Sequence, residues 1–254
     1  MTKRFVVGGT ALVAALVAWL PLAHAAPVPV RFTEGVMHGF PVLRSAQGER
    51  LASGELTQVG RGDVVESRLV FRFQDGSLYD ETVVFSQRDV FKIDKYRLVQ
   101  RGPSFPESVE ASIDRATGNY GVRYRADQDS AEEVLSGRFT LPDDVYSGML
   151  GVALKNLAPG ESATVQIVVF TPQPRLVKVL LAPHSVDQLT IGERPITTTR
   201  YTIKPQLGML ASLLVVDVAP VQCWVLKGDA PAFIKFEGPL YFMEAGASPL
   251  RTQH

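Results

Sequence analysis

The side chains that most often perform catalysis or bind metals are few in this chain and far apart. Beyond the first 25 residues the histidines are His38, His184 and His254. A catalytic zinc needs three fixed protein ligands, and no spacing of His38 and His184 with a carboxylate supplies them. A Ser–His–Asp triad built on His184 and Asp187 lacks the Gly-x-Ser-x-Gly turn that presents the serine in one class of hydrolases. The sequence therefore predicts no catalytic residue, no metal and no cofactor. A secreted hydrolase would need His38 or His184 to meet a carboxylate in a cleft.

Two other reactive groups have structural interpretations. Asp143 and Asp144 could serve as paired carboxylates in acid–base catalysis, but they stand at the start of a predicted helix, where negative charge is stabilising. Cys223 is the only cysteine, so the chain folds without an internal disulfide. It lies beside Trp224 in an apolar stretch with no histidine or basic residue nearby in sequence. Its thiol is therefore predicted to be buried and structural.

A local excess of positive charge runs through Arg88, Lys92, Lys95, Arg97 and Arg101. One interpretation is a basic rim beside an apolar cavity, suited to an anionic lipid head group. The alternative is a solvated edge strand whose lysines oppose aggregation.

The adjoining segment 100–106, Gln-Arg-Gly-Pro-Ser-Phe-Pro, predicts a stiff loop, because two prolines fix φ and Gly102 permits a bend. Arg101 and Ser104 would there meet a polar head group while Phe105 lines an entrance. Alternatively, the loop is a corner between strands in which Phe105 anchors the core.

The first 25 residues predict a secretory signal peptide. Lys3 and Arg4 precede an apolar run over 5–22, and Ala-His-Ala at 23–25 fits a cleavage site. The alternative is an uncleaved membrane anchor, since the run is about long enough to span. Cleavage leaves 26–254, a single β-rich domain that is periplasmic or secreted and not an integral membrane protein.

The charge balance argues against a nucleic-acid partner. The full chain has 26 basic and 26 acidic residues, and removal of Lys3 and Arg4 changes this to 24 against 26. A nucleic-acid-binding protein needs a net basic face to neutralise phosphates.

Short β-type runs fill most of the chain that follows. Apolar residues alternate with other residues over 64–73 and again over 77–87, and Asp75-Gly76 between them predicts a hairpin. Further strands are predicted over 55–61, 90–100, 107–114, 120–125, 132–140, 163–170, 175–181, 187–191, 195–204, 221–226, 232–236 and 240–243. The apolar run 209–218 fits strand and helix equally. This regular spacing predicts an antiparallel meander that forms a barrel, half-barrel or sandwich.

One stretch predicts a helix, over 143–157. Its apolar residues recur at the spacing of a buried helical stripe, namely Tyr146, Leu150, Ala153, Leu154 and Leu157. Pro142 fits a first helical turn, and Ala-Pro-Gly at 158–160 ends the pattern. We predict a mainly β fold, a curled antiparallel half-barrel or barrel, with this helix packed on its concave face.

Four fragments resemble a group of bacterial exported proteins of unknown function. They are Gln-x-Gly-Pro-Ser-Phe-Pro at 100–106, Leu-Pro-x-Asp at 141–144, Pro-x-Leu-Val-Lys at 174–178 and Ala-Pro-Ala-Phe-x-Lys-Phe-Glu-Gly-Pro-Leu-Tyr at 230–241. The strand pattern is also similar to that of the periplasmic lipoprotein carriers, whose half-barrel binds acyl chains. This second resemblance is one of fold and does not settle function.

The function predicted from these features is non-covalent binding of a lipid or other apolar small molecule in a cavity between sheet and helix. Strand and helix parity predicts the ligand-binding residues Phe71, Phe73, Phe85, Lys95, Arg101, Phe105, Leu150, Leu154, Val169 and Trp224. The alternative is a structural or protein-interaction protein of the cell envelope, with a packed core and a partner bound through a sheet edge.

Overall fold

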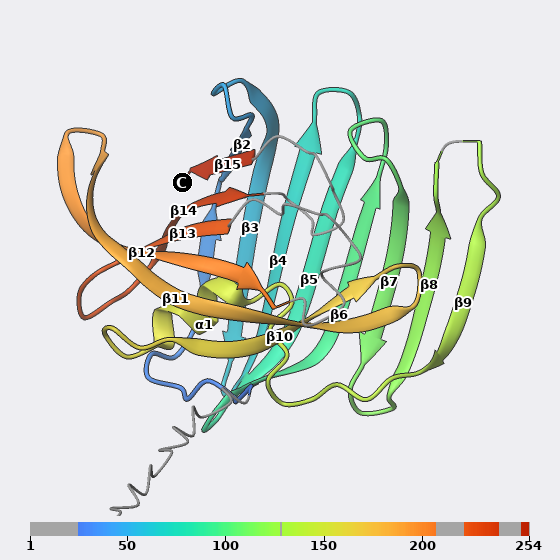
Figure 1. Cartoon of the computed structure of the whole chain (residues 1–254), viewed down its shortest axis with the longest axis horizontal. Helices are drawn as coiled ribbons and strands as arrows, with labels where there is room; N and C mark the ends of the chain where they lie inside the picture. Colours follow the sequence, from blue (N-terminus) through green and yellow to red (C-terminus); the bar gives the residue numbers. More distant parts are fainter. Residues whose placement is uncertain (1–24, 128, 207–220, 239–249, 254) are drawn as a thin grey trace, which may run out of the picture.

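The computed structural model describes residues 25–127, 129–206, 221–238 and 250–253 (Figure 1). Nearly all of the predicted signal peptide lies outside these residues. So do the apolar run at 209–218 and the predicted strand at 240–243.

Fifteen strands of the described chain form one sheet in which all paired strands are antiparallel. They are β1 (Met37–Gly39), β2 (Val42–Arg44), β3 (Arg50–Arg61), β4 (Val64–Phe73), β5 (Leu78–Gln87), β6 (Phe91–Arg101), β7 (Ser108–Asp114), β8 (Asn119–Arg125), β9 (Glu133–Arg138), β10 (Ala163–Phe170), β11 (Pro174–Ile191), β12 (Arg194–Pro205), β13 (Val221–Leu226), β14 (Phe233–Gly238) and β15 (Leu250–Gln253). The predicted mainly β fold is confirmed.

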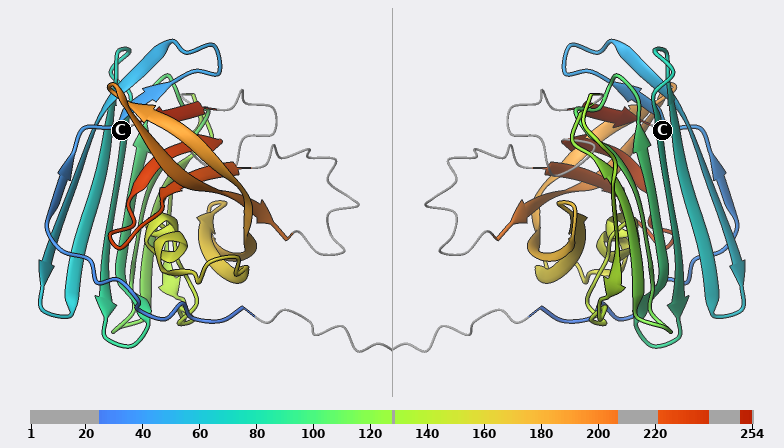
Figure 2. Two further views of the ribbon diagram at one scale, coloured as in Figure 1. Left: turned by 90° about the vertical axis from the view of Figure 1, so that its left-hand side faces the viewer. Right: turned by 90° about the vertical axis from the view of Figure 1, so that its right-hand side faces the viewer.

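The sheet curls into a half-barrel. Strands β10 to β15 follow one another in chain order, β2 pairs with β15, and β3 to β9 complete the series, while β1 pairs with β3 off this path. Figure 2 shows the strands β11 to β14 standing opposite the broad face made by β3 to β8. The two ends of the series, β9 and β10, do not pair with each other in the described sheet, so the barrel stays open.

Alternation along the strands places apolar side chains on the concave face. In β7, Val109, Ala111 and Ile113 are buried and the residues between them are exposed, because successive side chains of a strand point to opposite faces. The hairpin of β4 and β5 turns at Asp75-Gly76 as predicted, and Gly76 adopts φ 84°.

The strand β11 joins two runs that the sequence separated. The predicted strands 175–181 and 187–191 are parts of one 18-residue strand. The register against β12 shifts between Pro183 and Ser185. Because a β-bulge takes up the extra residue at a proline, the pairing resumes beyond it.

The helix α1 (Leu150–Asn156) packs inside the curl but is shorter than the predicted 143–157. Its buried residues include Val152, Ala153 and Leu154. The N-cap is Met149, which makes no side-chain capping hydrogen bond. The apolar stripe therefore identified the helix correctly and misplaced its start.

The residues before the helix pair with a strand instead of coiling. Val145 forms a parallel bridge with Gln166 of β10, and the Asp144 carboxylate accepts from Gln166 Nε2 at 2.9 Å. Asp143 pairs with Lys92, with 2.7 Å between Oδ2 and Nζ. The prediction that both aspartates cap a helix is therefore wrong. Asp144 bonds to Gln166 and Asp143 pairs with Lys92, and the helix begins only at Leu150.

Two hydrophobic clusters fill the curl. The larger joins the buried side of α1, through Leu154, to sheet residues such as Phe85 and Phe91. The smaller lies toward the β4–β5 turn and includes Phe71 and Phe105. Leu98 is partly buried and packs against both.

Candidate ligand-binding cavity

A cavity of about 270 Å³ lies between the two clusters. Its walls come from the concave face of the sheet, from α1 and from the loops beside them. Its lining is Pro41, Leu56, Leu69, Phe71, Tyr79, Glu81, Tyr96, Leu98, Gln100, Glu107, Val109, Ser147, Gly148, Leu150, Gly151, Leu154, Ile167, Val168, Val169, Phe170, Ile203, Cys223, Phe233 and Phe236. Most of these side chains are apolar, which is typical of small-molecule sites.

The helix forms one wall through its first turns. Leu150, Gly151 and Leu154 line the cavity. A Cβ atom added at Gly151 would lie 3.7 Å from the Phe233 ring, an ordinary van der Waals contact. The absence of a side chain at Gly151 thus leaves part of the space between α1 and β14 open.

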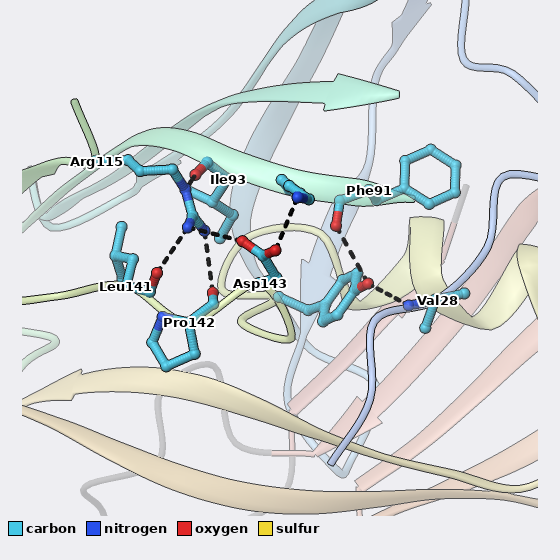
Figure 3. A network of polar contacts seen from close by, with 9 residues as sticks. Val28, Phe91, Ile93, Arg115, Leu141, Pro142 and Asp143 are labelled. Atoms are coloured by element: carbon cyan, nitrogen blue, oxygen red, sulfur yellow. Dashed lines mark hydrogen bonds and ion pairs between the residues drawn. The ribbon is translucent and has the colours of Figure 1, made fainter. Parts of the chain in front are cut away.

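Arg115 holds the segment that leads into the helix (Figure 3). From the turn between β7 and β8, its guanidinium donates to the carbonyl oxygens of Ile93, Leu141 and Pro142 and forms an ion pair with Asp143. The bond to Leu141 is 2.6 Å and the bond to Pro142 is 3.0 Å. The planar guanidinium carries five N–H donors, so one side chain can bond to three backbone carbonyls. One of them is in β6 and two are in the segment before α1.

Tyr146 fixes the same segment at a second point. Its ring is fully buried, and its hydroxyl accepts from Val28 N at 2.6 Å and donates to Phe91 O at 3.2 Å. Burial raises the pKa of Tyr146 to about 12. This hydroxyl joins the N-terminal segment, β6 and the approach to α1.

The far end of α1 is tied to the N-terminal segment. Lys155 Nζ lies 2.5 Å from Glu34 Oε1, and both side chains are largely buried. Asn156 Oδ1 accepts from the backbone N–H groups of Arg31 and Phe32 at 2.8 and 2.7 Å. Both ends of the helix are therefore held, so contacts within the protein fix this wall of the cavity.

A carboxyl group projects into the apolar part of the cavity. Glu81 Oε1 accepts from the Tyr96 hydroxyl at 2.7 Å, and Tyr79, two residues before Glu81 on β5, also lines the cavity. Burial raises the pKa of Glu81, because a low-dielectric site disfavours the charged form. Burial, together with the nearby carboxylate, holds the pKa of both tyrosines well above the usual range, so both remain hydrogen-bond donors.

A second polar group lies at the Gln100 side of the cavity. Gln100 is buried, and its Nε2 lies 3.5 Å from the Glu107 carbonyl oxygen. The Glu107 carboxylate accepts from the Tyr124 hydroxyl at 2.7 Å. Gln100 and Val109 also line a second hollow, which Arg101, Arg123 and other residues at the end of the sheet form.

Four of the ten predicted ligand-binding residues line the cavity, namely Phe71, Leu150, Leu154 and Val169. Phe85 is fully buried in the solid core under the helix, with its ring 6.1 Å from Phe91. Phe73 and Phe105 pack edge to face at 5.2 Å outside the cavity lining. The alternative interpretation of Phe105 as a core anchor therefore describes its position.

Trp224 points away from the cavity. Because neighbours in a strand face opposite sides, Cys223 lines the cavity and Trp224 does not. The indole N–H donates to Asp187 Oδ2 at 2.8 Å. Arg200 and Lys235 lie over the ring, at 5.8 and 4.5 Å from its centroid. The prediction that Trp224 faces the cavity was therefore wrong. Its indole N–H bonds to Asp187, which does not line the cavity.

The basic residues predicted at the mouth also lie elsewhere. Lys95 is exposed and its Nζ lies 3.5 Å from Asp114, and Arg97 pairs with Glu110 at 2.9 Å. Arg101 lies in the second hollow. Their strand, β6, pairs with β5 on one side and β7 on the other, so it is not an edge strand.

The loop after β6 closes a corner of the fold. Gly102 adopts φ 106°, and a Cβ there would lie 2.6 Å from Ser77 Cα. Ser104 N donates to Ser77 Oγ at 2.8 Å, and Ser104 Oγ donates to Asp75 at 2.7 Å. The hydroxyl that was predicted to meet a head group is thus used within the loop.

Sequence reasoning missed the polar centre of the cavity. The signal was present in β5, where Tyr79, Val83 and Phe85 share one parity and Glu81 falls between them. A carboxylate on an apolar strand face is costly unless it has partners or a function. Cys223 was correctly predicted to be buried, and its burial raises the pKa of the thiol.

Among the described residues, no group of three histidine, cysteine or acidic side chains could hold a metal ion. His38 pairs with Glu55 at 3.0 Å on the surface. No helix in the described part of the chain has the length and apolar character needed to cross a membrane.

The fold and the cavity together define a β-rich half-barrel protein with an apolar pocket under a helix. The chain is similar to the crystal structure of a beta-barrel-like protein of domain of unknown function DUF1849 from Brucella abortus. The TM-score is 0.43 and the sequence identity 10%, over 91% of this chain and 97% of that chain. No protein-family model matches the chain, and comparison with curated proteins finds no match.

Proposed function

We propose that this is an exported envelope protein that binds a hydrophobic or lipid-like ligand non-covalently in the cavity between sheet and α1. The observation that carries the proposal is the mostly apolar space of about 270 Å³ between two hydrophobic clusters. Small-molecule sites range from about 300 to 1,000 Å³, so this cavity suits a single alkyl chain or a compact apolar molecule.

The anchored helix supports this proposal. Folded cores are packed to high density, and voids larger than a water molecule are few. The contacts of Arg115, Tyr146 and Lys155 hold the helix and its approach in place around the cavity. Such preorganisation lowers the cost of binding. The signal-peptide pattern in the first 25 residues and the resemblance to lipoprotein carriers agree with an exported carrier of apolar ligands.

Native mass spectrometry of the full chain, expressed with its leader and purified from the periplasm or medium, tests the proposal. We expect a co-purifying lipid or other apolar species at about one per chain, to be identified after denaturation. A mass equal to the bare chain, with no uptake of added decanol, would overturn it.

A pair of matched variants ties binding to the cavity. Gly151→Leu places a side chain between α1 and Phe233 and should reduce ligand occupancy several-fold. Gly35→Leu is the control, because a Cβ there meets nothing within 4 Å and Gly35 does not line the cavity. Equal occupancy in the two variants would show that the ligand binds elsewhere.

The second candidate is a structural or protein-interaction role through a sheet edge. The strand β9 ends the series of paired strands, and its Val134 is 72% exposed. An exposed edge can accept a strand from a partner. Under this alternative, the bare chain would bind no apolar probe, and Val134→Lys would weaken partner binding.

A further inference from the structure

The carboxyl of Glu81 stands on an otherwise apolar surface. Its cross-strand partners are Leu69 on β4 and Leu98 on β6, and all three line the cavity. Gly148 closes over it from the helix approach, where an added Cβ would lie 3.2 Å from Glu81 Cδ. The carboxyl is therefore directed at the cavity from its floor.

Among the described residues, the donors to this carboxyl leave acceptor capacity that a ligand can use. An ionised carboxylate offers about four lone-pair sites, and Tyr96 supplies one donor at 2.7 Å, with Tyr79 beside it in the cavity lining. Both tyrosines belong to the sheet, and the bond from Tyr96 fixes the orientation of the carboxyl group. Glu81 lines the cavity, so a ligand there can supply a further donor.

The charges that line the cavity have one sign. The lining contains Glu81 and Glu107, and none of the described residues that line it is lysine, arginine or histidine. The basic residues near this strand, Lys95 and Arg97, pair with acidic partners outside the cavity. An anionic head group would therefore meet no counter-charge among these residues. It would also be repelled by the two carboxylates, because like charges repel more strongly in a low-dielectric site than in water.

We propose that Glu81 is the polar contact of the ligand and selects an amphiphile with a hydrogen-bond-donating head group, an amine or a hydroxyl, over one with a carboxylate or phosphate. The inference rests on the proposed function, since it specifies the ligand of the same cavity. It replaces the anionic head group that the basic run suggested. The apolar wall takes the alkyl part, and Glu81 with its two tyrosines takes the donor.

The test compares three probes with the same alkyl chain: decylamine, decanol and decanoate. Titration into ligand-free full-length protein is followed by calorimetry, below the concentration at which each probe forms micelles. A hydrogen bond to a charged group contributes about 1.5–3 kcal/mol, or roughly 10- to 100-fold in affinity. We therefore expect decylamine to bind at least about tenfold more tightly than decanoate, with decanol between them.

The variant Glu81→Gln keeps the size of the side chain and removes its charge. It should lower the ratio of decylamine to decanoate affinity by about tenfold or more while decanol still binds. The control is Glu110→Gln, which removes an exposed carboxylate that pairs with Arg97 outside the cavity. It should leave the ratio unchanged.

The outcomes separate this inference from the proposed function. If none of the three probes binds, the cavity is not a ligand site and both proposals fail. If the probes bind but decanoate binds the wild-type protein as tightly as decylamine, the role of Glu81 is refuted while the ligand site stands. The comparison on the wild-type protein decides this even if a variant fails to fold.

Discussion

The hydroxyl of Tyr146 is predicted to contribute more to stability than any phenol on the surface. The variant Tyr146→Phe keeps the buried ring and removes the oxygen that bridges Val28 N and Phe91 O. Both groups would be left without this partner in the core. Because the ring stays, the change opens no cavity larger than the lost hydroxyl.

The magnitude follows from the two bonds. Each buried polar group left unsatisfied costs about 1–3 kcal/mol, and the 3.2 Å bond to Phe91 is the weaker of the pair. We expect a loss of about 2–4 kcal/mol in the free energy of unfolding. For a chain of this size that corresponds to a fall in Tm of roughly 5–15 °C.

The assay is urea unfolding at equilibrium, followed by tryptophan fluorescence. Tyr124→Phe is the matched control, because its hydroxyl bonds to the partly exposed Glu107 carboxylate, which water can solvate instead. That variant should lose less than about 1 kcal/mol. If Tyr146→Phe and Tyr124→Phe are equally stable, the hydroxyl does not fix the helix approach as described.

Three further predictions concern the cavity. Glu81→Gln should stabilise the protein at pH 7 and have little effect near pH 4. The pKa of Glu81 is raised in the folded state. The wild-type protein therefore loses stability as the pH rises above the ordinary pKa of a glutamate, and the variant does not. Thermal unfolding of both proteins at the two pH values checks this, and a difference independent of pH would contradict it. Gly151→Ala should raise the free energy of unfolding by about 0.5–1 kcal/mol, because alanine favours a helix and its Cβ meets only ordinary contacts; chemical denaturation would show a loss instead if the site were tight. Cys223, buried and with a raised thiol pKa, should react with iodoacetamide only after unfolding, and fast labelling of the native protein, measured by mass spectrometry, would show that the cavity admits the reagent.

Local patterns were reliable where a strand or turn depends on neighbouring residues. Strands at 64–73, 163–170 and 221–226 have the predicted bounds, because alternation and turn chemistry act over a few residues. The stripe that includes Leu150 and Leu154 identified the helix. The predicted start of the helix was wrong because Gln166, 21 positions after Val145 and in β10, pairs with the segment around Val145.

The sequence by itself determined the class of the protein: a mainly β chain with one buried helix and no local catalytic motif. Only the tertiary structure decided which residues form the cavity. Cys223 faces it and Trp224 does not, because the register of β13 against β12 sets which parity points inward. Glu81 meets the Tyr96 hydroxyl only when β5 and β6 pair. Such contacts depend on how the whole sheet curls, and no short-range pattern in the chain encodes that curl.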